Sequence, residues 1–182
     1  MPGIVNDIDT DALSDTIKAV AADPEKGMMS FNVKSRWDGQ FRSEAVPGDI
    51  VLGGERVERN FQIDADEPKE LLGKDSAANP QELLMAAMNA CMIVGYVSGA
   101  AMNGVTLTKL EIETEGELDL RGFLNIDPTI KPGYETIHYN VTIAGDGTPE
   151  QFEAIHENVK RLSPNRYNVS MPIMLTSSLT VE

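Results

Sequence analysis

The sequence contains a single cysteine, Cys91, and only two histidines in 182 residues. One cysteine excludes an intramolecular disulfide, and we expect a reducing, cytoplasmic environment. His138 and His156 lie far apart and have no cysteine or carboxylate at a ligand spacing, so neither a metal nor another cofactor is predicted. The N-terminus lacks a basic region followed by an apolar run, so no signal peptide is expected.

Positive charge is also scarce. The chain has 15 basic and 29 acidic residues and a formal net charge of -14. Its field repels polyanions, which argues against nucleic acid and anionic membrane surfaces as partners and leaves small neutral or apolar molecules. The length and the ordinary apolar content, with 5% aromatic residues, predict one soluble globular domain.

Charge is absent altogether from Leu83 to Met102. Asn79 is a good N-cap, Pro80 suits the first helical position, and Asn103-Gly104 supplies a left-handed stop, so this stretch is predicted to be one helix. The alternative interpretation of these twenty uncharged residues is a helix that spans a membrane. Its Ala, Gly and Met content and its lack of interfacial anchors favour a buried central helix that is covered nearly all round.

The segments around this helix predict an α+β domain with an antiparallel sheet. Residues 1–28 are interpreted as an N-terminal extension with a short helix from Asp9 or Thr10, and residues 29–182 as the domain. A helix that is apolar on all sides needs more cover than one sheet and one further helix provide, so a homodimer is expected. The remaining predicted elements are strands at 29–37, 40–46, 50–52, 57–63, 105–120 with a bulge at Gly116, 137–143 and 171–181, a helical turn at 68–72, a loop at 121–134, and a helix that begins with a capping box at 148–151.

Residues 79–87 read Asn-Pro-Gln-Glu-Leu-Leu-Met-Ala-Ala, and Ala90-Cys91 follows. This motif resembles the Asn-Pro-Glu-Glu-Leu-Leu-x-Ala-Ala…Ala-Cys signature of the OsmC/Ohr family of osmotically induced and organic hydroperoxide resistance proteins. The order of the other segments is similar over residues 29–182, whereas residues 1–28 have no counterpart. The resemblance implies an OsmC-like fold, an intertwined homodimer with two interface sites, and thiol peroxidase activity in active members.

In such peroxidases a thiolate attacks the peroxide, an arginine lowers the pKa of the thiol, a glutamate holds the arginine, and a second cysteine forms a disulfide. The resemblance places Cys91 at the attacking cysteine, although a lone cysteine on an apolar helix is otherwise more often an inert core residue. Ser163 stands where the resolving cysteine is expected, just before Pro164.

Gln81 stands where the family has its glutamate, ten residues before Cys91. In a continuous helix that spacing is about 15 Å, so a shared site needs the partner chain's copy or a break in the helix. Glu82 keeps a carboxylate, but it lies about 180° round the helix from Cys91 and is not expected to substitute.

Arg36 and Arg42 both flank the Trp37-Asp38-Gly39 turn, and Arg42 follows the turn as the family arginine does. Arg42 is therefore the preferred assignment, against the alternative that either arginine is only a solvated strand residue. Two further sets are open to a structural or a site role: basic residues near Ser163 and methionines on the apolar helix, namely Lys160, Arg161, Arg166, Met85, Met88, Met92 and Met102.

Two functions follow from these assignments. The first is a one-cysteine thiol peroxidase that reduces organic hydroperoxides and is recycled by an external thiol reductant. The second is a catalytically degenerate dimer that binds a small hydrophobic ligand or is structural. Retention of Cys91 favours the first, whereas Gln81 and Ser163 favour the second.

Overall fold

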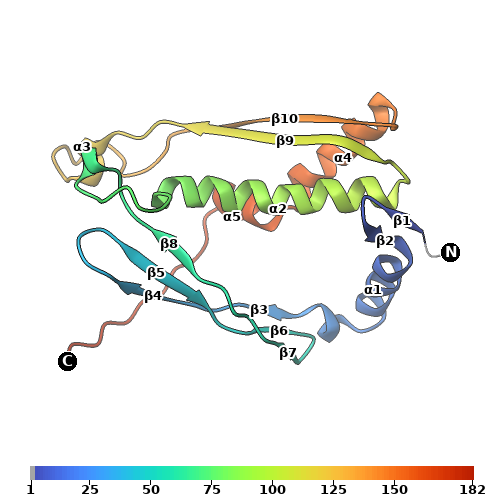
Figure 1. The fold of residues 1–182 in the computed structure, drawn as a ribbon, viewed down its shortest axis with the longest axis horizontal. Coiled ribbons are helices and arrows are strands. Elements are labelled where there is room, and N and C mark those ends of the chain that lie inside the picture. The colour runs from blue at the N-terminus through green and yellow to red at the C-terminus, as the bar shows by residue number, and fades with distance from the viewer. Residues whose placement is uncertain (1–2) are drawn as a thin grey trace. The chain divides into compact units, whose positions relative to one another are not determined.

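The computed structural model describes residues 3–182, and the chain divides into two compact units whose boundary falls after Ala86, inside the long helix α2 (Pro80–Met102). The first unit holds a short helix, a two-stranded hairpin and two three-stranded sheets, and the second holds a two-stranded sheet with three further helices (Figure 1). All the strand pairs in the described residues are antiparallel, which confirms the predicted mixture of helices with antiparallel strands.

The first unit opens with a hairpin of β1 (Ile4–Val5) and β2 (Ile8–Asp9), which the sequence did not predict. Helix α1 (Thr10–Ala22) follows, and the Asp9 carboxylate accepts a hydrogen bond from the Ala12 N–H as its N-cap. The predicted N-terminal helix is thus confirmed, with Asp9 as the cap, and a 3₁₀ turn (Pro24–Gly27) ends it. Residues 1 and 2 of the predicted extension lie outside the described residues.

Two three-stranded sheets make up most of the first unit. Turn chemistry explains their hairpins: Gly39 and Gln40 between β4 and β5 have φ of 82° and 46°, and Gly53 and Gly54 between β6 and β7 have φ of 56° and 85°. The predicted 29–37 strand is split at Asn32, whose side chain donates to the Asp49 carbonyl. In spatial order the sheets are β3 (Met29–Ser30), β6 (Ile50–Leu52), β7 (Glu55–Val57), and β4 (Val33–Trp37), β5 (Ser43–Pro47), β8 (Ile63–Ala65).

One face of the β4-β5-β8 sheet is apolar and uncovered. Val33 and Trp37 share this face because strand side chains alternate, and they are 58% and 77% exposed. Met29 and Phe31, before this strand, are exposed as well, at 48% and 68%. The short 3₁₀ turn Lys69–Leu71 confirms the helical turn predicted before α2.

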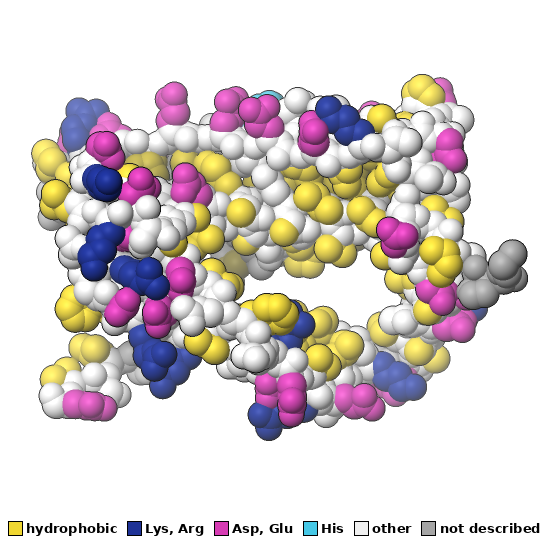
Figure 2. All heavy atoms as spheres, viewed as in Figure 1, with side chains coloured by type: hydrophobic (Ala, Val, Ile, Leu, Met, Phe, Trp, Pro, Cys, Tyr) yellow, Lys and Arg dark blue, Asp and Glu magenta, His cyan; other side chains and the backbone are white. Residues whose placement is uncertain are grey.

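The second unit is built on a long antiparallel pair, β9 (Leu107–Gly116) and β10 (Ile137–Gly145). Leu110 and Ile112 face the core, whereas the alternate positions of β9 carry acidic side chains that line the outer face of the pair (Figure 2). Helix α4 (Pro149–Leu162) begins with the predicted capping box between Thr148 and Gln151, and α5 (Pro164–Ser170) follows it directly.

The core of the second unit lies between α2, α4 and this sheet. Met88, Met92, Tyr96 and Ala100 recur every four residues of α2 and form its buried stripe. α2 and α4 approach closely because a Cβ on Gly95 would lie 3.1 Å from Val159 and one on Gly99 would lie 3.2 Å from Ile155. On α2 the Asn89 amide also accepts from the Thr114 hydroxyl at 2.6 Å and so fixes the helix on β9.

The remaining surface of α2 is apolar and exposed, with Ile93 at 37% and Val94 at 68%. Among the described helices α2 is the one long and apolar enough to cross a membrane, a test that the core helix of a water-soluble protein also passes. The buried stripe makes α2 a core helix on one face, whereas its other face is exposed in the single chain.

Four predicted features of the second unit are wrong. The strand predicted to reach residue 120 ends at Gly116, and the register irregularity falls at Ala144 and Gly145 rather than at Gly116. Asp119 caps a short helix, α3 (Leu120–Phe123), inside the predicted loop. Residues 171–181, predicted as a strand, pair with no other strand in the described part of the chain. A strand is stable only where a neighbour takes up its backbone hydrogen bonds.

Candidate functional site around Cys91

Cys91 lies in the middle of α2 and is half-buried. It directly precedes the buried Met92 and follows the buried Met88 by three residues. Its Sγ accepts a hydrogen bond of 3.5 Å from the backbone N–H of Asn165, the second residue of α5. The Asn165 side-chain amide also donates to the Ala87 carbonyl at 2.9 Å, one turn before Cys91. Two contacts from one residue therefore fix the start of α5 on the turn of α2 that carries the cysteine.

Ser163 stands two residues before this contact, at the junction of α4 and α5. It is 4% exposed, and its Oγ has no hydrogen-bond partner among the described residues. The structure thus brings the Ser163-Pro164-Asn165 segment to Cys91, as the resemblance implies, and leaves a buried hydroxyl there without a partner. The role of Ser163 itself stays a prediction.

A second tie holds α5 on β10. The Arg166 Nε donates to the Tyr139 hydroxyl at 2.9 Å, and its guanidinium carbon lies 6.0 Å from the Tyr139 ring centroid. Within residues 3–182 no carboxylate oxygen lies within ion-pair distance of Arg166, so its charge is not neutralised directly. Of the basic residues near Ser163, Arg166 is therefore the one built into this region.

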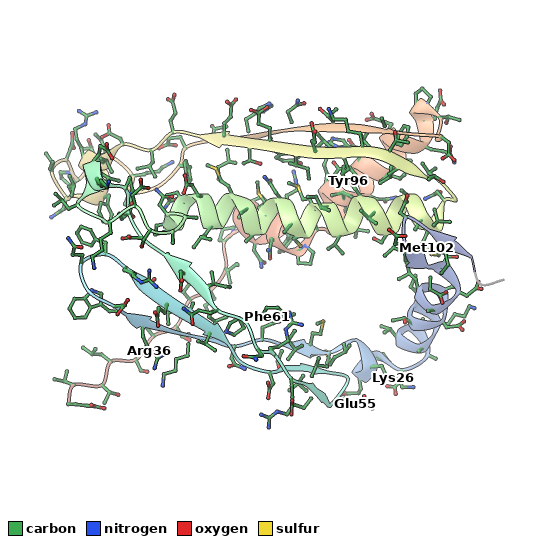
Figure 3. All side chains as sticks on the ribbon, viewed as in Figure 1. Lys26, Arg36, Glu55, Phe61, Tyr96 and Met102 are labelled. Atoms are coloured by element: carbon green, nitrogen blue, oxygen red, sulfur yellow. The ribbon has the colours of Figure 1, made fainter. Side chains whose placement is uncertain are left out.

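Tyr96, labelled in Figure 3, carries the polar part of the core one turn beyond Cys91. Its hydroxyl forms a 2.6 Å hydrogen bond with Nδ1 of His156, and the two rings stack with centroids 6.1 Å apart. Burial raises the pKa of Tyr96 to about 12. His138, by contrast, is exposed on β10 and does not take part in this contact. No group of three metal-ligating side chains occurs in the described residues.

Arg42, in the first unit, is held by a cluster of acids. Its Nε donates to Asp38 at 2.9 Å, and its Nη2 lies 3.4 Å from both Glu44 and Asp64. The Glu44 hydrogen bond is the main cause that raises the pKa of Arg42. Arg36, by contrast, is an exposed residue of β4, so of the two arginines only Arg42 has a fixed guanidinium.

Asp66 organises the loop that joins β8 to α2, a role that the sequence did not indicate. It is 1% exposed and accepts hydrogen bonds from the Ser76 hydroxyl at 2.7 Å and from the backbone N–H groups of Glu67, Lys74 and Ser76. These bonds, led by that of the Ser76 hydroxyl, lower the pKa of Asp66. The Ser76 oxygen also accepts from Arg42 at 3.3 Å, so Asp66 supports Arg42 through Ser76.

Glu82 belongs to a capping box at the start of α2. The Asn79 N–H donates to the Glu82 carboxylate at 2.8 Å, and the Glu82 N–H donates to the Asn79 side chain at 2.9 Å. This use agrees with the expectation that Glu82 does not replace the family glutamate. Gln81 is exposed, and α2 is continuous from Pro80, so the helix break considered for Gln81 does not occur.

The comparisons with known proteins identify the family. The family model of the OsmC-like proteins matches residues 73–177, more than half of the chain, so the chain belongs to this family. No curated protein matches it.

Solved structures show the same fold. An OsmC-like protein of Mycoplasma pneumoniae is 15% identical with a TM-score of 0.61, over 78% of this chain and 87% of that one. A Psychrobacter arcticus protein, provisionally named for osmotic stress induction and detoxification response, is 18% identical with a TM-score of 0.56, over 80% and 90%. An OsmC-like protein of unknown function from Vibrio cholerae is 14% identical with a TM-score of 0.51, over 76% and 92%.

Proposed function

We propose that this OsmC-like protein is a one-cysteine thiol peroxidase in which Cys91 reduces organic hydroperoxides and an external thiol recycles it. The observation that carries the proposal is the N–H of Asn165 directed at Sγ of the cysteine in the family motif. A donor in that position stabilises negative charge on the sulfur, and Cys91 as a residue is only half-buried.

The reaction runs in two steps. The thiolate of Cys91 bonds to one peroxide oxygen while the O–O bond breaks, and the other oxygen leaves as an alcohol after taking a proton. The sulfur is oxidised by two electrons to a sulfenic acid. An external thiol then displaces water to give a mixed disulfide, and a second thiol releases reduced Cys91.

Arg42 is our candidate for the arginine of the reaction. The family uses a glutamate to hold this group, and Gln81 lacks the charge for that task. In this chain Asp38, Glu44 and Asp64 already hold the Arg42 guanidinium, so loss of the family glutamate leaves it ordered. The same three carboxylates screen its charge, so we expect a slower peroxidase than one with an unscreened arginine.

We further propose that the working unit is a cytoplasmic homodimer with an apolar substrate. Two apolar faces support this proposal: the exposed face of α2 around Val94 and the uncovered sheet face around Trp37. A second copy of the chain supplies matching faces for both, which is the simplest way to remove them from water. Met88 and Met92 are buried next to Cys91 on α2, so the surroundings of the cysteine on its core side are apolar.

The alternative is a catalytically degenerate dimer that binds a small hydrophobic ligand. The buried Ser163 hydroxyl favours it, because a serine cannot form the resolving disulfide and its unpartnered oxygen is available to a bound polar group.

Sulfenic acid trapping separates the two functions. Reduced protein is treated with stoichiometric cumene hydroperoxide, trapped with a sulfenic-selective reagent and weighed intact, with Cys91→Ser as control. The peroxidase predicts rapid trapping on Cys91 only. Oxidation no faster than that of free cysteine rejects the enzyme and leaves the ligand-binding dimer.

A further inference from the structure

The chain has no second thiol. The segment Ser163-Pro164-Asn165, where the family resemblance places the resolving cysteine, instead contacts the Cys91 sulfur through the backbone nitrogen of Asn165. We propose that the backbone nitrogen of Asn165 resolves oxidised Cys91 by forming a cyclic sulfenamide, an S–N bond between the two residues. This inference rests on the proposed peroxidase function, because it begins from the sulfenic acid that a hydroperoxide produces.

The geometry supplies the nucleophile. The Asn165 nitrogen lies 3.5 Å from Sγ, and as the second residue of α5 its N–H has no partner within that helix. The nitrogen already occupies one side of the sulfur, so a peroxide oxygen must add from another side. The sulfenic hydroxyl then lies away from the nitrogen, where a leaving group belongs.

Two ties keep the nitrogen in place while the sulfur reacts. The Asn165 amide bonds the Ala87 carbonyl at 2.9 Å, and Arg166 bonds the Tyr139 hydroxyl at 2.9 Å. Proximity of this kind turns a slow bimolecular encounter into an intramolecular step. Ser163, buried and without a partner for its Oγ, adds a free hydroxyl to the same segment.

The step balances without a further oxidant. The Asn165 nitrogen bonds to Sγ, the S–O bond breaks, and the sulfenic hydroxyl leaves with the amide proton as water. The sulfur stays at the oxidation level that the peroxide gave it. An external thiol later attacks Sγ, breaks the S–N bond, returns the proton to nitrogen and forms the mixed disulfide of the recycling step. The sulfenamide would protect Cys91 from oxidation to sulfinic acid.

Peptide mass spectrometry tests the bond directly. The wild-type protein is oxidised with stoichiometric cumene hydroperoxide without trapping reagent, alkylated and cut with trypsin, which yields peptides 75–109 and 162–166. We expect the two peptides joined, with a combined mass lower by two hydrogens, fragments that place the link on Cys91 and Asn165, and release by a thiol.

Variants assign the link to the backbone. Asn165→Ala keeps the backbone N–H but loses the tie to Ala87, so the joined peptides should persist at several-fold lower yield. Their complete loss would assign the link to the side-chain amide and overturn the inference. Asn165→Pro removes the N–H, and we expect several-fold faster conversion of Cys91 to sulfinic acid by excess peroxide.

The inference and the peroxidase fail differently. If sulfenic acid is trapped rapidly in the wild-type protein but no joined peptides form without the reagent, the sulfenamide is rejected and the peroxidase stands. If Cys91 does not react with peroxide faster than free cysteine, both are rejected. The wild-type measurement decides the question even if Asn165→Pro does not fold.

Discussion

Tyr96 and His156 form a 2.6 Å hydrogen bond between Oη and Nδ1 that joins α2 to α4 in the core of the second unit. Tyr96 is fully buried, and its surroundings also include Tyr139, Arg166 and Glu157. Burial is the main cause that raises its pKa from 10.0 to about 12. The folded state therefore retains the phenolic proton at a pH where the unfolded chain releases it.

This difference predicts a loss of stability at high pH. A raised pKa gives a contribution that is complete below pH 10 and disappears as the pH rises through about 12. At about 1.4 kcal/mol per pKa unit, we expect the free energy of unfolding to fall by roughly 3 kcal/mol in total. Urea unfolding at several pH values measures it, and Tyr96→Phe should remove this part of the slope. An unchanged slope in Tyr96→Phe would contradict the role of Tyr96.

Arg42 is predicted to activate Cys91, whereas Arg36 is not. Arg42→Ala should slow alkylation of Cys91 by iodoacetamide at neutral pH several-fold, because a positive charge favours the thiolate. Arg36 is the matched control, since it lies on the same hairpin but is exposed and not held by the acid cluster. Equal alkylation rates in the wild type and both variants would remove Arg42 from the site.

Asp66 is predicted to make the loop before α2 sensitive to acid. Its lowered pKa means that its contribution to stability is present above the ordinary value of 3.8 and is lost as the pH falls through the lower folded value. Asp66→Asn keeps the shape but loses the charge, so it should be less stable than the wild type at neutral pH and the difference should shrink in acid. Denaturant unfolding at both pH values tests this.

If Asp66→Asn also slows alkylation of Cys91, the support of Arg42 through Ser76 reaches the cysteine. Ser76→Ala is the matched control, because it removes the shared hydroxyl and leaves the Asp66 charge. A difference in stability that stays constant into acid would rule out the charge of Asp66 as the cause.

The homodimer predicts a mass of about twice 19.8 kDa by light scattering. Val94→Glu should weaken it, because it places a charge on the exposed apolar face of α2. Ala154→Glu, at an exposed position of α4, is the matched control and should remain dimeric. A stable folded wild-type monomer at micromolar concentration would contradict the dimer and any site that needs the partner.

The sequence predicted what local chemistry determines. Asn79, Pro80 and Gly104 bound α2 because caps and left-handed stops act within a few residues. A strand was predicted over residues 171–181, but a strand also needs a neighbour, and Leu175 is 88% exposed. A pattern shows which residues can form a strand and does not show where the partner lies.

The site was predictable only where the resemblance supplied the residues. Cys91 and Ser163 came from the motif, whereas the contact between Asn165 and Cys91 joins residues 74 positions apart and has no local signal. The resemblance gave a role to Ser163 but none to Asn165. Asp66 was missed because its role depends on a closed loop, in which backbone donors up to ten positions away converge on one carboxylate.

Gly95 and Gly99 have no side chain, and this allows α4 to lie close to α2. Helix α5 continues directly from the end of α4. The contact between the Asn165 nitrogen and the Cys91 sulfur therefore depends on how α2 and α4 pack at these two glycines. A methyl group added at Gly95 or Gly99 would press on Val159 or Ile155 of α4, so we expect it to shift the Asn165 nitrogen relative to the sulfur although no residue that contacts Cys91 is replaced.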